Sequence, residues 1–470
     1  MTNEIRTKVL VVGSGPGGYV AAIRAGQLGL DTTIVENERL GGTCLIRGCI
    51  PSKALIHVAG KFEAMQHATN GGSLGIRLRE APILDLPKTI AWKETIVDKL
   101  NSGVGALLKR VKVKVVQGWA TFSDAKTCVV NGSGDPVTIT AEHVILANGS
   151  EPVELPTLPF GGMVLSSTEA LSLQEIPEQF VVVGAGYIGL ELGIAFRKMG
   201  SNVAVVEALD RILPLYDEQL TDPVRKWLAR AGVTVHLGAK AKGLTGDTNR
   251  RSLQVELKDG QKLDIPADKI LVTVGRRPKT KGWGLEKMAV DMVGPFVKVD
   301  DQCKTSVKNV WAIGDLVGEP MLAHKASAQA EMVAEIIAGK PRRFRPATIP
   351  AVCFTEPEIV TAGMLPAEAK AAGNDVITGL FPLSANGRAL SMEGGSEGGF
   401  IRIVAQRDNH RVLGAQAVGT HVSELSGEFV HAIEMGAVLE DIAGTIHVHP
   451  TLTEAFHESA LRALGHAIHI

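Results

Sequence analysis

The sequence predicts an α/β protein that contains the same strand–turn–helix–strand unit twice. The first copy starts with the strand-like residues 9–12 and ends at Glu36, and the second starts with residues 180–183 and ends at Glu207. In both copies a GxGxxG turn follows the first strand, and 23 residues separate its first glycine from the acid. A strand, glycine turn, helix, strand and acid in this order are typical of a Rossmann-like dinucleotide-binding domain.

The first unit has the parts needed to hold a pyrophosphate. Gly13 permits the tight turn, Gly15 lets a phosphate approach the backbone, and Gly18 lets the helix pack on the strand. Residues 19–28 have helical spacing, so the N-terminus of this helix would face the phosphates. Glu36, which closes the next strand, can accept hydrogen bonds from ribose hydroxyls.

The second unit repeats this arrangement with Gly184, Gly186, Gly189 and Glu207, so we expect the chain to bind two dinucleotides. One copy could be a degenerate relic, but both retain every glycine and the acid. Glu207 suits a free 2′-hydroxyl and would repel a 2′-phosphate, and no arginine follows it before Arg211. NAD is therefore favoured over NADP.

Cys44 and Cys49 follow the first unit directly, in the segment GGTCLIRGCIPSK of residues 41–53. Two thiols beside a nucleotide site suggest electron transfer between a cofactor and a disulphide. The alternatives are unpaired thiols, a zinc site, or a structural bridge, which would contribute only about 2 kcal/mol in so short a loop. No second cysteine pair or Cys–His cluster completes a four-ligand zinc set, so no metal site is expected.

Length and composition favour a cytoplasmic enzyme of several domains. The 470 residues predict three or four domains, and the net charge of −1 gives no electrostatic argument for nucleic acid or an anionic membrane. Five cysteines leave at least one unpaired, which suits a reducing cytosol. The sequence has no signal-like start and no apolar run of about 20 residues that would span a membrane.

Seven segments, in order, resemble those of the class I pyridine nucleotide–disulphide oxidoreductases, most closely the dihydrolipoamide dehydrogenases. The two nucleotide units resemble the FAD and NAD sites of that family, and residues 41–53 resemble its redox-disulphide segment. The other four matches are residues 273–278 (TVGRRP), 311–315 (WAIGD), 321–325 (MLAHK) and 447–454 (HVHPTLTE). They resemble the end of the NAD domain, the second FAD segment, the helix beneath the flavin and the C-terminal catalytic motif.

The resemblance implies two Rossmann-like domains followed by a C-terminal α+β dimerisation domain. The expected boundaries are 1–150 for the FAD domain, 151–276 for the NAD domain, 277–345 for a central domain that completes the FAD site, and 346–470 for the interface domain. A proline-rich crossing at residues 151–159 and a basic, turn-rich linker at residues 340–346 support two of these cuts.

The resemblance also implies which residues form the sites. The FAD site is expected to include Gly13, Gly15, Gly18, Glu36, Gly42, Thr43, Lys53, Ala120, Asp315 and Ala323. The NAD site is expected to include Gly184, Gly186, Gly189, Glu207 and Gly275. The catalytic residues are expected to be Cys44, Cys49, Lys53, Glu191, His449 and Glu454.

The implied reaction converts dihydrolipoamide and NAD⁺ into lipoamide and NADH. By family match, Cys44 is the interchange thiol that forms a mixed disulphide, and Cys49 is released as a thiolate against the flavin. Pro51 suits the first turn of a helix, which would place Cys49 near a helix N-terminus and favour its thiolate.

Charged side chains complete the implied mechanism. Lys53 matches the residue that approaches the flavin nitrogen, and Glu191 matches its ion-pair partner. His449 matches the base, with Glu454 holding its imidazole in one tautomer. His447 is expected to be structural, and His324 to shape the flavin pocket. The remaining cysteines, which match no redox motif, are expected to be core or surface thiols: Cys128, Cys303 and Cys353.

The implied partners are a second copy of the chain, in a homodimer, and the lipoyl domain of a 2-oxoacid dehydrogenase complex or glycine cleavage system. The residues leave open which complex is served, because all lipoyl carriers present the same dithiol. A glutathione reductase would prefer NADPH, and a mercuric reductase would add a C-terminal cysteine pair, yet no cysteine follows Cys353. A non-catalytic flavoprotein subunit is the alternative outside enzymes, against which the cysteine pair and the His449–Glu454 pair argue.

Three positions depart from the family pattern. Ile46 and Arg47 replace an Asn and a small apolar residue between the cysteines, and Arg47 adds a positive charge there. Asn148 replaces the usual Thr before the interdomain crossing. None of these changes removes a group that does chemistry.

Overall fold

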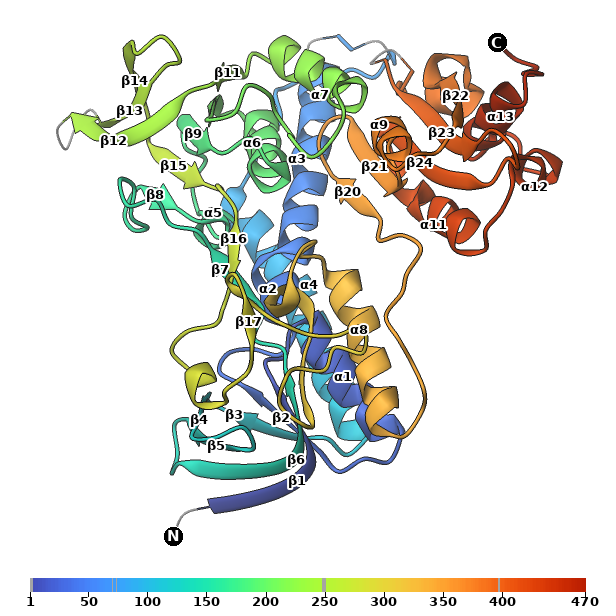
Figure 1. Ribbon diagram of the computed structural model, residues 1–470. Coiled ribbons are helices and arrows are strands. Elements are labelled where there is room, and N and C mark those ends of the chain that lie inside the picture. The colour runs from blue at the N-terminus through green and yellow to red at the C-terminus, as the bar shows by residue number, and fades with distance from the viewer. Residues whose placement is uncertain (1–2, 70, 73, 247–250, 396–397) are drawn as a thin grey trace. The chain divides into compact units, whose positions relative to one another are not determined.

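The structure is a computed structural model that describes all residues except 1–2, 70, 73, 247–250 and 396–397. It contains two compact units, and each is assembled from three separate stretches of chain (Figure 1). The first unit comprises residues 1–154, 166–175 and 274–345. The second comprises residues 155–165, 176–273 and 346–470.

The first unit is built on a seven-stranded sheet. Its strand order is β3-β2-β1-β6-β5-β4, and β19 also pairs with β6. The pairs among β1, β2, β3, β6 and β19 are parallel, whereas β4, β5 and β6 pair antiparallel. The strands are β1 (Asn3–Val12), β2 (Thr32–Glu36), β3 (Lys114–Gln117), β4 (Trp119–Phe122), β5 (Thr127–Asn131), β6 (Val137–Leu146) and β19 (Val310–Ala312).

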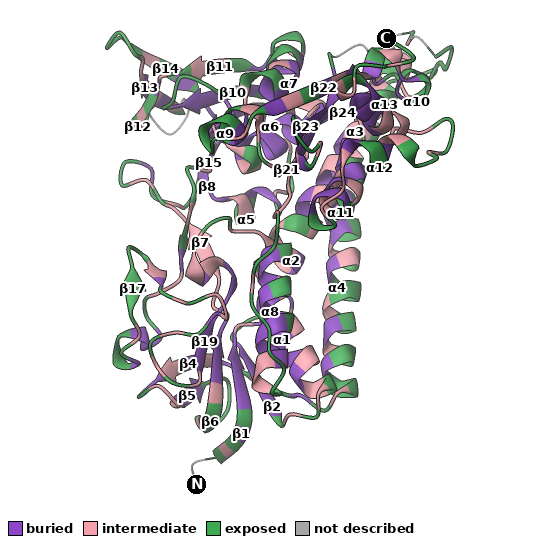
Figure 2. Ribbon diagram, turned by 45° about the vertical axis from the view of Figure 1, so that its right-hand side comes forward, coloured by how far each residue is buried: buried purple, intermediate pink, exposed green. Residues whose placement is uncertain are grey.

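The helices of the first unit are α1 (Pro16–Gln27), α2 (Gly42–Arg47), α3 (Cys49–Thr69), α4 (Leu86–Arg110), α5 (Ser167–Ala170) and α8 (Ala323–Ile337). Of these, α1 packs on β1 and β2 and closely against α8. α1 begins with proline in its first turn, as helices favour, and buries small residues such as Ala21 and Ala25. Its Arg24 forms an ion pair with Glu335 of α8. Buried residues, purple in Figure 2, run along α1 and α8.

The predicted elements of the first unit are confirmed, with different ends. The strand expected over residues 9–12 is β1, which starts at Asn3 because its first half pairs with β6 from Val137 onward. The helix expected over residues 19–28 starts at Pro16. Alternation of polar residues in the first half of β1 hid that half from a reading based on a continuous apolar run.

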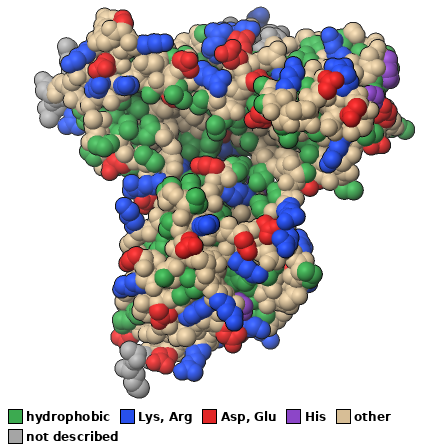
Figure 3. Space-filling model, viewed as in Figure 1, with side chains coloured by type: hydrophobic (Ala, Val, Ile, Leu, Met, Phe, Trp, Pro, Cys, Tyr) green, Lys and Arg blue, Asp and Glu red, His purple; other side chains and the backbone are tan. Residues whose placement is uncertain are grey.

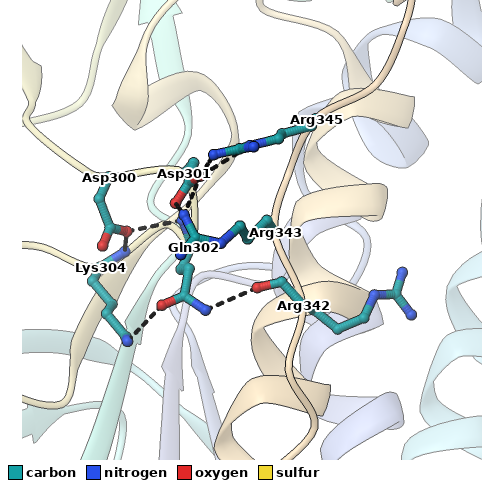
Figure 4. Close-up of polar contacts among 7 residues, drawn as sticks. All are labelled: Asp300, Asp301, Gln302, Lys304, Arg342, Arg343 and Arg345. Atoms are coloured by element: carbon teal, nitrogen blue, oxygen red, sulfur yellow. Dashed lines mark hydrogen bonds and ion pairs between the residues drawn. The ribbon is translucent and has the colours of Figure 1, made fainter.

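Short elements complete the first unit. They are β7 (Ser150–Pro152) paired with β16 (Arg276–Pro278), β17 (Met292–Val293) paired with β18 (Phe296–Val297), and the 3₁₀ helices η1 (Leu285–Lys287) and η2 (Gly314–Val317). The linker expected at residues 340–346 lies almost entirely in the first unit, which ends at Arg345. Arg343 and Arg345 both donate to the carboxylate of Asp301, and Gln302 donates to the carbonyl of Arg342 (Figure 4).

The second unit contains a five-stranded parallel sheet of order β11-β10-β9-β15-β8. Its strands are β8 (Val164–Leu165), β9 (Gln179–Val183), β10 (Asn202–Glu207), β11 (Thr234–Leu237) and β15 (Lys269–Val272), with helices α6 (Tyr187–Met199) and α7 (Glu218–Arg230). Between β11 and β15 the chain forms a separate antiparallel sheet of three strands: β12 (Lys240–Gly246), β13 (Arg251–Glu256) and β14 (Lys262–Pro266). The predicted strands at residues 180–183 and 203–206 are β9 and β10.

The C-terminal part of the second unit is an antiparallel sheet of order β20-β21-β24-β23-β22 with helices. The strands are β20 (Ala351–Cys353), β21 (Glu358–Gly363), β22 (Val376–Pro382), β23 (Phe400–Gln406) and β24 (Val412–Gly419). The helices are α9 (Pro366–Ala371), α10 (Gly387–Ser391), α11 (Ser426–Glu434), α12 (Leu439–Gly444), α13 (Glu454–Ala463), η3 (Leu383–Ala385) and η4 (Val422–Leu425). The core of this part packs α11 and α13 on the sheet through Phe429 and Phe456, whose ring centroids are 4.8 Å apart.

The surface carries mixed charges. Figure 3 shows lysine and arginine side chains interspersed with aspartate and glutamate on the visible face, in keeping with the net charge of −1. In the described part of the chain, every helix is too short or too polar to cross a bilayer. The expected division into four domains stays a prediction. The boundaries of the two compact units are not those of the four expected domains.

Candidate active site

The three glycines of the first turn have different roles: Gly13 and Gly18 are required by the local packing, and Gly15 leaves space beside the backbone. Gly13 has a φ of +92°, a conformation that favours glycine. A Cβ on Gly18 would lie 1.8 Å from the carbonyl oxygen of Gly13, so only glycine lets α1 approach β1 this closely. A Cβ on Gly15 would meet no atom within 4 Å. The turn is thus built as the sequence predicted, with free space above Gly15 at the N-terminus of α1.

The acid that ends β2 holds this turn in place. Glu36 is buried, and its Oε2 accepts hydrogen bonds from the Ser14 N–H at 2.8 Å and the Ser14 hydroxyl at 2.7 Å. Its Oε1 accepts from the Glu38 N–H at 2.9 Å. Ser14 was not among the predicted site residues, although its position between two glycines could have indicated a contact to the acid.

The second turn repeats the first in detail. Gly184 has a φ of +103°, and a Cβ on Gly189 would lie 2.2 Å from the carbonyl oxygen of Gly184. A Cβ on Gly186 would meet no atom within 4 Å. Glu207 is buried and accepts hydrogen bonds from the backbone N–H groups that precede Gly186 and follow β10, those of Ala185 at 2.7 Å and Leu209 at 2.8 Å.

The two cysteines lie on consecutive helices next to the first turn. Cys44 belongs to α2 and is half-buried, and Cys49 starts α3 and is exposed. α2 reaches the turn because Gly42, at φ +58°, packs on Gly15: a Cβ on Gly42 would lie 2.5 Å from the Gly15 Cα. The start of α3 at Cys49 is the helix N-terminus that Pro51 predicted.

Both cysteines are thiols in this structure, and they interact. A hydrogen bond with Cys49 and burial raise the pKa of the Cys44 thiol, and the charge of Lys53 opposes this only in part. The raised pKa favours the protonated form of Cys44, and Cys49 lies at the N-terminus of α3. Burial, and to a smaller extent the charges of Cys44 and Cys49, raise the pKa of Tyr19.

Asp315 lies on η2 and is held by two side chains that the prediction missed. The Ser150 hydroxyl donates to its Oδ2 at 2.5 Å, and Arg276 Nε donates to the same hydroxyl at 2.8 Å. The neighbouring Gly314 N–H donates to Gln329 Oε1 on α8 at 2.8 Å. These contacts fix the carboxylate within the first unit.

The C-terminal histidines form two different pairs. His449 Nδ1 lies 2.8 Å from Glu454 Oε1, and the Thr451 N–H donates to Glu454 Oε2 at 2.8 Å. Burial acts to raise the pKa of Glu454, but the hydrogen bonds from Thr451 and His449 outweigh it and hold that pKa below its usual range. The carboxylate is thus anionic and fixes one imidazole nitrogen, while the His449 ring stays exposed.

His447 is instead buried against Glu428, with Nε2 at 3.0 Å from the carboxylate and Nδ1 at 2.9 Å from the Thr445 carbonyl. Burial raises the pKa of Glu428, and the hydrogen bond from His447 opposes that rise. Both ring nitrogens are engaged, so this geometry agrees with the expected structural role.

The comparisons with known proteins agree with this arrangement. Residues 7–330 match the family described as pyridine nucleotide-disulphide oxidoreductase, and residues 349–460 match the dimerisation domain of that family. A dihydrolipoyl dehydrogenase of Pseudomonas aeruginosa is 57% identical and covers 100% of both chains. One of Bacillus subtilis is 44% identical and covers 99% of this chain and 98% of its own. A crystal structure of LpdA from Mycobacterium tuberculosis has a TM-score of 0.88 and 27% identity, covering 97% of this chain and 99% of its own.

This chain belongs to the pyridine nucleotide–disulphide oxidoreductases.

Membership shows an enzyme, a flavoprotein disulphide oxidoreductase of the dihydrolipoyl dehydrogenase type, and enzymes of this type use FAD and NAD(H). The residues present fit both cofactors. The open space above Gly15 and Gly186 suits the close approach of a pyrophosphate to each turn. In addition, Asn148 Oδ1 is buried next to Gly13 without a hydrogen-bond partner among the described residues. This oxygen can therefore accept a hydrogen bond from a bound group.

The residues expected to bind FAD all belong to the first unit, whereas most of those expected to bind NAD belong to the second. Gly275 is the exception, because it lies in the first unit, where its carbonyl accepts from the Val153 N–H. Lys53 and the cysteines lie in the first unit, and Glu191, His449 and Glu454 in the second. Within each unit, the printed contacts join Cys44 with Cys49 and His449 with Glu454.

The other expected side chains are found as follows. The thiols of Cys128, Cys303 and Cys353 are all buried, as core thiols are. Arg47 forms an ion pair with Glu38, so the extra positive charge between the cysteines is offset. Ala120 is buried on β4, and Ala323 is the first residue of α8. No group of residues that could hold a metal ion occurs in the described part of the chain.

Proposed function

We propose that this enzyme oxidises dihydrolipoamide to lipoamide and passes the two electrons to NAD⁺. The observation that carries the proposal is the pair of interacting thiols, Cys44 and Cys49, on helices that pack against a dinucleotide turn. Full-length likeness to dihydrolipoyl dehydrogenases supports this substrate over other thiols. Glu207 supports NAD⁺ as acceptor, because its carboxylate would face the 2′-phosphate of NADP⁺.

The thiol steps follow the roles that the family resemblance implies for the two cysteines. In the oxidised enzyme a substrate thiolate attacks Cys44 of the Cys44–Cys49 disulphide, forming a mixed disulphide and releasing Cys49 as a thiolate. The second sulphur of the substrate then attacks the substrate sulphur that is bonded to Cys44. The disulphide bond of lipoamide forms, the bond to Cys44 breaks, and the Cys44 sulphur takes up the proton of the second substrate thiol, which leaves a Cys44 thiol and a Cys49 thiolate. The helix N-terminus at Cys49 stabilises the thiolate, and the raised pKa of Cys44 keeps the proton on the other sulphur.

FAD would be held by Gly13, Gly15, Gly18, Glu36 and Asp315 and, when bound, supplies the two-electron chemistry that links the dithiol to NAD⁺. Lys53 and Glu191 are proposed to bring charge to that site. Glu207 and the turn from Gly184 to Gly189 would orient NAD⁺.

His449 is proposed as the base that takes the proton from a substrate thiol. Its exposed ring nitrogen is free to meet a substrate, while Nδ1 is held by Glu454. The anionic Glu454 stabilises the imidazolium that forms. Because His449 lies in the stretch that matches the family's dimerisation domain, we propose that the histidine acts on the cysteines of the partner subunit in a homodimer.

The physiological partner is proposed to be a lipoyl domain of a 2-oxoacid dehydrogenase complex or glycine cleavage system, in the cytoplasm. The test is NADH formation from NAD⁺ with dihydrolipoamide, compared with NADPH-dependent reduction of glutathione disulphide and of mercuric ion. We expect turnover in the first assay only, with kcat/KM for NAD⁺ well above that for NADP⁺. Turnover with glutathione disulphide or mercuric ion, and none with dihydrolipoamide, would overturn the proposal.

A further inference from the structure

Helix α6 presents two buried charged side chains to one short segment of the C-terminal part of the second unit. Glu191 and Lys198 are seven residues apart, about two helical turns, and therefore lie on one face of α6. Relative exposure is 3% for Glu191 and 8% for the Lys198 side chain. The segment they meet is residues 353–356, which connects β20 to β21 near α6 (Figure 1).

Both charges are bound by this segment. The Phe354 N–H donates to Glu191 Oε1 at 3.0 Å, and Lys198 Nζ lies 2.6 Å from Glu356 Oε2. The Lys198 ammonium also lies 5.3 Å from the centre of the Trp227 ring on α7. A hydrogen bond from a backbone N–H to a carboxylate is charge-assisted, and its donor cannot rotate away as a side chain can.

Cys353, the first residue of the segment, is held by a contact with Tyr216. The Cys353 thiol donates to the Tyr216 hydroxyl at 3.2 Å, and both residues are buried. Burial, the Cys353 thiol and the charge of Glu191 all raise the pKa of Tyr216, so the phenol stays neutral beside the carboxylate. Three side chains, two from α6 and one from the loop before α7, thus hold residues 353–356: Glu191, Lys198 and Tyr216.

We propose that residues 353–356 position the Glu191 carboxylate, with Lys198 and Glu356 as positioning residues that keep the Phe354 N–H aimed at it. The C-terminal sheet would thereby fix the one acidic side chain that the proposed function pairs with Lys53. The inference rests on that proposed function for Glu191. It predicts that removing the Lys198–Glu356 ion pair loosens the Glu191 carboxylate.

The test is a double-mutant cycle in the full-length FAD-loaded enzyme. Lys198→Met should lower kcat for NADH formation by about three- to tenfold and change KM for dihydrolipoamide little, since a hydrogen bond to a charged group is weakened. In a Glu191→Gln background the same change should alter kcat by less than about 1.5-fold, because the two residues act through one contact. Amide hydrogen exchange of residues 351–357 should rise about tenfold in Lys198→Met, and the midpoint potential of the bound flavin should shift only when Glu191 is present.

Lys226→Met is the matched control. Lys226 is an exposed lysine on α7 in an ion pair of the same length, 2.6 Å to Asp222, so its loss should leave kcat, potential and exchange unchanged. If Lys198→Met fails to fold, Glu356→Gln replaces it. Unchanged kcat and exchange, or effects of Lys198→Met and Glu191→Gln that simply multiply, would refute the positioning role. A parent enzyme that does not oxidise dihydrolipoamide would overturn the proposed function instead, and the exchange comparison alone would then decide the inference.

Discussion

The thiol chemistry is concentrated in Cys49, the residue that begins α3. A serine there keeps the size and the helix start but cannot form a disulphide with Cys44. We expect Cys49→Ser to retain FAD and the parental circular dichroism spectrum but to lose dihydrolipoamide turnover by more than about 10²-fold, on the order of a lost catalytic group. The measurement is NADH formation per bound FAD.

Cys128→Ser provides the control for this change. Cys128 is buried on β5 and takes no part in the proposed reaction, so turnover per bound FAD should match the parent, even if burial of a hydroxyl lowers the Tm. Thiol-dependent activity of Cys49→Ser within tenfold of the parent would contradict the assignment of the redox pair.

For the His449–Glu454 pair, we expect the loss of the histidine to lower kcat more than the loss of the glutamate. Positioned acid–base catalysis contributes about 10²- to 10⁴-fold, so His449→Gln should reduce kcat by that order. Glu454→Gln should cost less, since an amide oxygen can still accept from Nδ1 at the 2.8 Å position and only the charge is lost. Steady-state kinetics of the two variants side by side decide the order. A larger loss for Glu454→Gln than for His449→Gln would contradict the assigned roles.

At the scale of elements, the two glycine turns separate packing from binding. A methyl group on Gly189 would lie 2.2 Å from the Gly184 carbonyl oxygen and 2.6 Å from Thr273 Oγ1, whereas one on Gly186 would meet nothing within 4 Å. Gly186 also has a φ of −74°, which alanine adopts readily. Gly189 therefore serves the packing of α6 on β9, and Gly186 serves the approach of a dinucleotide.

We therefore expect Gly189→Ala to lower stability by about 1–3 kcal/mol, the usual cost of overpacking, and to lower the Tm by several degrees. Gly186→Ala should change the Tm little and instead raise KM for NAD⁺ by about tenfold, because its methyl group would occupy the place of the pyrophosphate. Differential scanning calorimetry and NAD⁺ titrations measure the two effects. The opposite pattern, a stable Gly189→Ala and an unfolded Gly186→Ala, would contradict this division of roles.

Elements were largely predictable because their signals are local. The strand, turn and helix of each nucleotide unit follow from apolar runs and glycine spacing, and residues 9–36 and 180–207 fold as expected. The hydrogen bond from Ser150 to Asp315, and that from Arg276 to Ser150, were not predictable, since the three residues come from distant parts of the chain. The hydrogen bonds that Glu36 and Glu207 receive from their own turns were also missed, because the motif was interpreted only in terms of its ligand.

For the whole molecule, the decisive question is whether each active site is shared between subunits. His449 and Cys44 lie in different units of the chain, and the C-terminal part matches a dimerisation domain. If the histidine serves the partner, a heterodimer of Cys44→Ser with His449→Gln has both defects in one site and leaves the other intact. About half of the parental activity should then return, given the 10²- to 10⁴-fold loss at a defective site.

The experiment uses purified heterodimers carrying two different affinity tags. Each homodimeric variant should be nearly inactive, and activity should appear only after subunit exchange. A heterodimer without recovered activity would rule out the shared site and leave the chemical role of His449 to be judged from its own variant.

The interleaving of the two units has a consequence for how the protein is made. The first unit needs residues 1–154, 166–175 and 274–345, so its sheet lacks β19, and the unit lacks η2 with Asp315, until about two thirds of the chain has left the ribosome. The N-terminal nucleotide turn is translated first, yet the residues that close the unit around it are translated after most of the NAD-binding part. A nascent chain arrested before residue 310 should therefore expose an incomplete sheet edge, which attracts chaperones and proteases. Capture of the flavin would then mark the passage of Asp315, late in translation.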